Sequence, residues 1–138
     1  MKVQILPELE IVLRLLLAAA LGAGIGYQRE RAGKPAGLRT HSLIALGSAL
    51  FTVVSMVGFG DGVDPSRVAA GVVTGIGFIG AGVILRGVRG DHIVGLTTAA
   101  SIWATAAVGL AAGVGMYLIA AIVAAITVLV LLIPKVKG

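Results

Sequence analysis

The sequence contains no cysteine and little charge: 12% of its 138 residues are charged, whereas 58% are hydrophobic. The absence of cysteine excludes disulfides and thiolate metal sites. Soluble domains carry about 25% charged residues, and half that fraction does not cover the surface of a domain of this size. The apolar residues also gather into long runs. Together these features indicate a membrane protein.

Motifs for catalysis are missing as well. The sequence has no serine, histidine and aspartate set around a nucleophile turn, and no phosphate loop with its lysine. Gly75, Gly77 and Gly80 have the spacing of a dinucleotide fingerprint, but they lie inside an apolar run. Asp91 follows too early for the acid that such a site needs ~20 residues further on. We therefore expect neither an enzyme nor a nucleotide cofactor.

Five apolar segments follow one another along the chain, each close to the ~20 residues with which a helix crosses ~30 Å of hydrocarbon. They are residues 9–26, 41–59, 67–85, 94–112 and 115–133. None alternates apolar and polar residues as barrel strands do, so the sequence predicts an all-α bundle of five transmembrane helices. The glycines of "AAGVG", residues 111–115, suit a tight hairpin. A single long helix over 94–133, giving four spans, is the alternative.

Basic residues lie mostly in the loops that five spans place on one side. These are Arg29, Arg31, Lys34, Arg39, Arg86, Arg89, Lys135 and Lys137. The positive-inside rule makes that side cytoplasmic, so we expect the N-terminus outside and the C-terminus in the cytoplasm. The net charge of +5 then indicates contact with the lipid bilayer rather than with nucleic acid. We expect one domain over residues 1–138, a transmembrane domain without a soluble C-terminal domain.

Glycines are concentrated in the third segment and spaced along the first. At about 100° per residue, Gly71, Gly75 and Gly82 share one helix face, and Gly77 and Gly80 point to the opposite one. In the first segment Gly22 and Gly26 continue a four-residue spacing. Small residues let membrane helices pack closely, so these glycines predict helix packing within the chain and a homo-oligomer, with a dimer as the expected state. The alternative is a break in the third helix, where backbone groups would line an ion site.

Two stripes of small polar residues run along the second and fourth segments. The second carries His41, Ser48 and Thr52, and the fourth carries Thr98, Ser101 and Thr105. Such residues form hydrogen bonds between helices, or they line a path for a polar solute. The sequence leaves both interpretations open.

Three stretches in combination resemble the MgtC/SapB family of bacterial inner-membrane proteins. They are AGLRTH at 36–41, GIGFIGAG at 75–82 and GLTTAASIWATAAVG at 95–109. The resemblance extends from about residue 11 to 133. It implies a multi-pass protein of the bacterial inner membrane with a role in magnesium homeostasis, as a transporter or as a regulator of other membrane proteins. The residues that match the family are Arg29, Arg39, Thr40, His41, Gly75, Gly80, Gly82, Thr97, Thr98 and Trp103.

The chain departs from the family pattern at one position that bears on cation binding. The family has Glu-Arg after its first span, whereas this chain has Gln28 and Arg29. Magnesium is usually held through one or two carboxylates and retained waters, so the amide weakens a cation site there.

The leading hypothesis is a cation transporter, or a protein that assists transport, with Mg²⁺ as its ligand or substrate. The expected polar path comprises Gln28, Arg39, Thr40, His41, Ser48, Thr52, Asp91, Thr97, Thr98, Ser101 and Thr105. The competing hypothesis is a non-transporting regulator that docks another membrane protein through its glycine- and alanine-rich faces. A third is a self-associating structural protein without a ligand.

Overall fold

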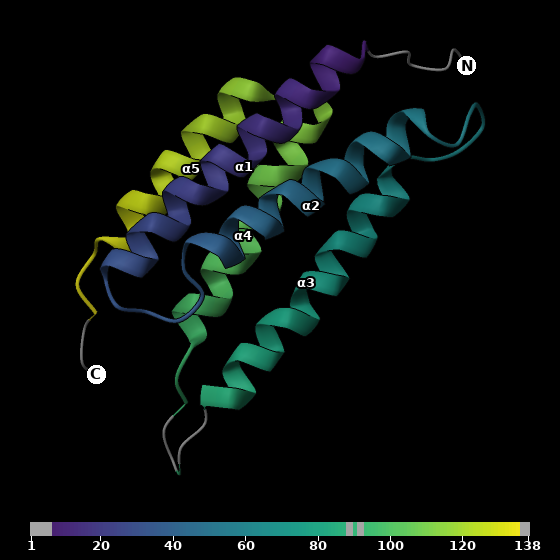
Figure 1. The fold of residues 1–138 in the computed structure, drawn as a ribbon. Helices are drawn as coiled ribbons and strands as arrows, with labels where there is room; N and C mark the ends of the chain where they lie inside the picture. The colour runs from purple at the N-terminus through teal and green to yellow at the C-terminus, as the bar shows by residue number, and fades with distance from the viewer. Residues whose placement is uncertain (1–6, 88–89, 91–92, 136–138) are drawn as a thin grey trace.

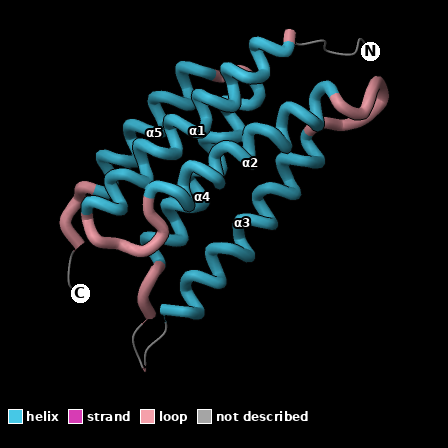
Figure 2. The backbone as a smooth tube through the Cα atoms, viewed as in Figure 1, coloured by secondary structure: helices cyan, strands magenta, loops and turns pink. Residues whose placement is uncertain are grey.

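The computed structural model describes residues 7–87, 90 and 93–135. Its regular elements are α1 (Glu8–Arg31), α2 (Leu38–Val57), α3 (Ser66–Gly87), α4 (Leu96–Val114) and α5 (Tyr117–Leu131). Within the described residues every regular element is a helix, as Figure 2 shows. The predicted all-α fold with five helices is confirmed.

The helices run alternately up and down the bundle (Figure 1). The ends of α1, α3 and α5 and the starts of α2 and α4 therefore lie at the same end of the molecule. By length and composition α1, α2, α3 and α4 could each cross a membrane, whereas the apolar helix α5 has only 15 residues. Which end faces the cytoplasm stays a prediction.

Backbone contact between α1 and α2 is made possible by glycine. A methyl group added at Gly22 would lie 2.5 Å from the carbonyl oxygen of His41 and 2.8 Å from Ala45 Cβ. One added at Gly26 would lie 2.6 Å from the carbonyl oxygen of Gly37. No side chain fits at either position, so the two helices touch along their backbones, as small-residue faces permit in membranes.

Helices α2 and α4 are also in close backbone contact, and here the glycines lie on α4. Gly109 lies against the backbone of Ala45, and a methyl group at Gly113 would lie 2.8 Å from the carbonyl oxygen of Ala49. The core around these contacts is built largely from alanine. Its fully buried alanines are Ala18, Ala45, Ala49, Ala112 and Ala120.

The connection between α4 and α5 is a tight turn at Gly115. This residue has φ +95°, a conformation that favours glycine. The N–H of Met116 donates to the carbonyl of Ala111 (2.9 Å) and that of Gly115 to Ala112 (3.1 Å). This is the Schellman pattern that ends helices. The break predicted at 111–115 is confirmed, and the alternative of one long helix is wrong.

Helix α3 is continuous from Ser66 to Gly87, so the alternative of a broken third helix is wrong. It lies at the side of the bundle and packs mainly on α4 (Figure 1). Of its predicted packing glycines, only Gly80 meets a neighbour, Ala99 Cβ at 3.4 Å.

A methyl group at any of the other four glycines would find no described atom within 4 Å; these are Gly71, Gly75, Gly77 and Gly82. Their predicted packing is therefore wrong within the single chain, because a helix at the edge of a bundle has a neighbour on one side only. Their packing against a second chain stays a prediction.

We expect Gly22→Ala to lower the free energy of unfolding by about 1–3 kcal/mol, because the added methyl group meets the backbone of α2. Gly24→Ala is the matched control two residues away, where a methyl group has open space. There the better helix propensity of alanine should leave stability unchanged or raise it by up to ~1 kcal/mol. Equilibrium unfolding of the two variants in detergent micelles measures the difference. Equal stabilities would contradict the close contact.

Candidate functional site

A fully buried histidine joins α2 to α4. His41 is 0% exposed, and its Nδ1 lies 3.0 Å from the carbonyl oxygen of Gly37. A carbonyl can only accept, so Nδ1 carries the proton. In the neutral ring Nε2 is then an acceptor, 3.0 Å from Ser101 Oγ, and the single proton of that hydroxyl is shared between Nε2 and the carbonyl oxygen of Thr98, which lies 2.8 Å from Oγ. This hydrogen bond links the two helices and fixes the orientation of the imidazole.

The polar stripe predicted on α2 and α4 is buried inside the bundle. Its residues are His41, Ser48, Thr52, Thr98, Ser101 and Thr105, each at most 6% exposed. Three of its hydroxyl groups donate within their own helix: Thr52 to the carbonyl of Ser48 and Thr105 to that of Ser101, both at 2.7 Å, and Ser101 to that of Thr98 at 2.8 Å. Their donors are therefore satisfied, while their oxygens keep the capacity to accept.

Arg29 is the residue near this stripe that the sequence did not single out as part of the path. It lies in the last turns of α1, is 4% exposed, and donates from Nη2 to Thr98 Oγ1. Its Nε is buried without a hydrogen-bond partner among the described residues, as is Oε1 of the adjacent Gln28. The signal was available, because Arg29 continues the helix face of Gly22 and Gly26, which was predicted to pack.

A pocket of about 620 Å³ opens beside Arg29, where α1 and α5 end and α4 begins. Its polar lining consists of Arg29, Lys34, Thr97, Thr98 and Lys135. Gly95, which precedes α4 with φ +94°, turns the chain so that the first residues of the helix border the pocket.

The residues of the expected path do not form one open site. Arg39 is exposed, Thr40 is half-buried and Thr97 is exposed at the pocket, whereas the residues of the stripe are buried, with Thr98 at the edge of the pocket. Asp91 lies outside the described residues. Within the described residues, no group of three or more histidine, aspartate or glutamate side chains could hold a metal ion.

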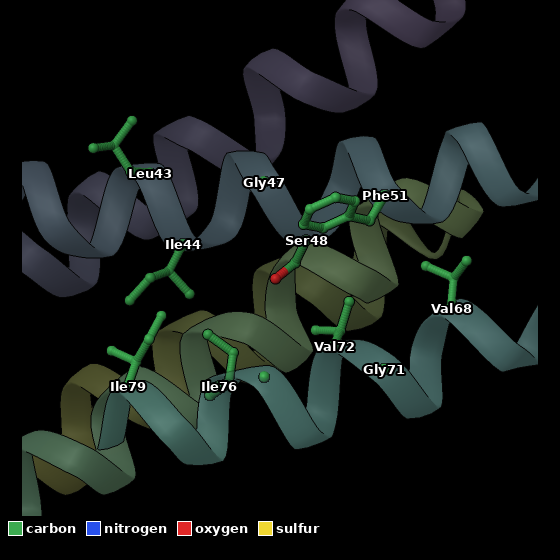
Figure 3. A pocket seen from close by; sticks show the side chains of 11 residues that line it. Leu43, Ile44, Gly47, Ser48, Phe51, Val68, Gly71, Val72, Ile76 and Ile79 are labelled. Carbon is green, nitrogen blue, oxygen red and sulfur yellow. The ribbon is translucent and has the colours of Figure 1, made fainter. Parts of the chain in front are cut away.

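A second pocket, of about 670 Å³, is a lipid-side groove between α2 and α3. Figure 3 shows Ile44 and Phe51 of α2 and Val72, Ile76 and Ile79 of α3 along its walls. Gly47, Gly71 and Gly75 also line it, which leaves the groove wide, and Ser48 of the polar stripe is the one polar side chain among its otherwise apolar lining residues. Its chemistry suits hydrocarbon, not an ion.

The other buried arginine, Arg14, lies at the opposite end of α1 and has its charge balanced. Its Nη2 donates to Glu10 (2.8 Å), its Nη1 to the carbonyl of Gly113 (2.7 Å) and its Nε to the Tyr117 hydroxyl (3.1 Å). The Tyr117 hydroxyl in turn donates to Glu10 at 2.9 Å. This cluster ties α1 to both α4 and α5, so we assign it a structural role.

Long apolar helices that touch through glycine and alanine, with polar side chains enclosed between them, define a helical membrane protein. Residues 15–137 match the MgtC family. The chain therefore belongs to the MgtC family.

Three relatives illustrate the similarity. The chain is 56% identical over 129 residues to the Escherichia coli K12 protein named "Putative magnesium transporter YhiD", covering 88% of this chain and 59% of that protein. It is 44% identical to SrpB of Synechococcus elongatus, covering 85% and 72% of the two chains. It is 46% identical to MgtC of Salmonella typhimurium, covering 77% and 44%. The chain thus spans little more than half of YhiD. No solved structure matches it.

We expect Tyr117→Phe to lower the free energy of unfolding by about 0.5–1.5 kcal/mol, because it removes the hydroxyl that bonds both Arg14 and Glu10. Tyr27→Phe is the matched control, since the Tyr27 hydroxyl contacts only the exposed Arg31, at 3.5 Å. Equilibrium unfolding of both variants in the same detergent makes the comparison. A control as destabilised as Tyr117→Phe would show that the cluster does not join the helices.

Proposed function

We propose that this protein serves magnesium homeostasis in the bacterial inner membrane by moving Mg²⁺, or by assisting its movement. The observation that carries the proposal is the stripe of six buried polar side chains on α2 and α4, in a bundle whose apolar core is built largely from alanine. The name of the relative YhiD supports magnesium as the ion.

The chemistry of the stripe suits a hydrated cation better than a bare one. Mg²⁺ prefers oxygen ligands and gives up its waters reluctantly. Thr52 and Thr105 offer hydroxyl oxygens whose own protons are already bonded, so these oxygens accept hydrogen bonds from the waters of the ion. Because α2 and α4 are in backbone contact at Gly109 and Gly113, passage requires the two helices to separate.

A flux measurement with matched threonine variants tests this function. Purified protein in liposomes should carry Mg²⁺ to an internal fluorescent indicator. Thr105→Val removes a fully buried hydroxyl of the stripe and should reduce the flux by roughly tenfold, the effect of losing one hydrogen bond to a charged group. Thr74→Val is the control, because Thr74 makes the same bond to its own helix on the exposed side of α3.

Three outcomes are informative. Flux that depends on Thr105 but not on Thr74 supports a path along the stripe. Flux equal to that of empty liposomes, with folded protein, would end the transport proposal. An equal loss of flux in both variants would show that the substitutions act by destabilising the protein and would contradict a path along the stripe.

A second candidate function is a regulator that docks a transmembrane helix of another protein. The observation in its favour is the apolar groove between α2 and α3, whose glycines Gly47, Gly71 and Gly75 leave room for a partner backbone.

A photo-crosslinking residue placed at Gly71 should then capture one partner protein in native membranes, and Gly75→Leu should abolish the capture by filling the groove. Gly24→Leu, on an open part of α1, should not. Crosslinks only between copies of this chain would contradict a regulator and indicate self-association.

A further inference from the structure

Three cationic side chains converge on the pocket at the ends of α1 and α5. Arg29, Lys34 and Lys135 all line it, and none of the described lining residues is acidic. Like charges that share one cavity repel each other, and the repulsion grows where the cavity wall excludes water. The pocket therefore has a strong positive potential.

The start of α4 adds to this potential. Leu96, Thr97 and Thr98 form its first turn and border the pocket, and no side chain of the described residues caps this helix end. The first N–H groups of a helix have no partner within it, and they carry the positive end of the helix dipole. Such a terminus binds anions, phosphate among them.

An independent observation comes from Arg29 itself. The side chain is 4% exposed, lines the pocket, and keeps its Nε without a partner among the described residues. Its hydrogen bond to Thr98 satisfies one N–H donor. It does not neutralise the positive charge of the guanidinium group, because a hydroxyl is neutral. Arg14, the other buried arginine of the same helix face, has Glu10 beside it. Arg29 is therefore a buried cation without a described counter-ion, next to an open cavity.

The remaining walls of the pocket are apolar. They include Val130 of α5, Ile133 just beyond its end and Leu96 at the start of α4. The volume of about 620 Å³ far exceeds that of a phosphate group, since one water occupies ~30 Å³ in the liquid. The ligand must combine an anionic head with an apolar body.

We propose that this pocket binds the phosphate group of an anionic phospholipid. Arg29 and the first turn of α4 contact the phosphate oxygens, Lys34 and Lys135 lie around the headgroup, and an acyl chain follows the apolar wall that includes Val130 and Ile133. Basic pockets between transmembrane helices bind lipid headgroups in this way. The pocket shares Thr98 with the polar stripe, but lipid binding at the pocket does not require cation transport.

Native mass spectrometry of the full chain, freed of lipid and titrated with phosphatidylglycerol or phosphatidylcholine, measures the preference. We expect tighter binding of phosphatidylglycerol, and Arg29→Gln should weaken it by roughly tenfold, the effect of losing one charge-assisted contact. Arg31→Gln is the matched control, because it removes the same charge two residues away and outside the pocket lining. It should leave the affinity unchanged.

A second variant guards against misfolding of Arg29→Gln. Lys34→Gln and Lys135→Gln together alter only exposed side chains and should weaken the same binding by about fivefold or more. Equal affinities for the two lipids, or a preference that both variants leave intact, would overturn the proposal. Competition by inorganic phosphate at concentrations comparable to those of the lipid would assign the pocket to free phosphate and overturn the lipid.

Discussion

Backbone contact of α2 with α1 and α4 is the constraint on which the rest of this structure depends. In lipid, helices gain nothing from hiding apolar side chains, so association rests on close van der Waals contact and hydrogen bonds. Gly22 and Gly26 on α1 and Gly109 and Gly113 on α4 remove the side chains that would keep the helices apart. The close approach also brings polar groups within reach. Gly113 packs against α2, and its carbonyl accepts a hydrogen bond from Arg14 on α1.

The five helices and the hairpin could be predicted from the sequence, because apolar run length and a glycine-rich break are local properties of the chain. The sequence predicts which glycines share a helix face, but not which of these faces contact another helix. For Gly22 and Gly26 the shared face meets α2. For Gly71 and Gly75 it meets no described atom, because periodicity does not tell which side of a helix has a neighbour. Arg29 was missed for a related reason. It was counted among the loop charges, whereas α1 extends to Arg31 and carries it into the interior.

Some buried polar groups of the bundle have hydrogen-bond partners among the described residues, and others have none. His41, Ser101, Thr52 and Thr105 have their polar hydrogens bonded within the protein, so these donors need no ligand to satisfy them. At one end Gln28 and Arg29 each keep a buried atom without a described partner. A glutamate at position 28 would bring a negative charge next to Arg29. The amide of this chain brings none, so the balance of charge at this end must come from elsewhere.

The Arg14 cluster has a consequence for the order in which the chain is made. Arg14 leaves the ribosome about a hundred residues before Gly113 and Tyr117, whose groups it binds in the finished bundle. An arginine that enters the bilayer alone is costly to insert. Glu10 precedes it by one helical turn and is present from the beginning, so the pair inserts with its charge already neutralised. Glu10 thus has two roles. It neutralises Arg14 before α4 and α5 are synthesised, and it completes the cluster with Tyr117 in the folded protein.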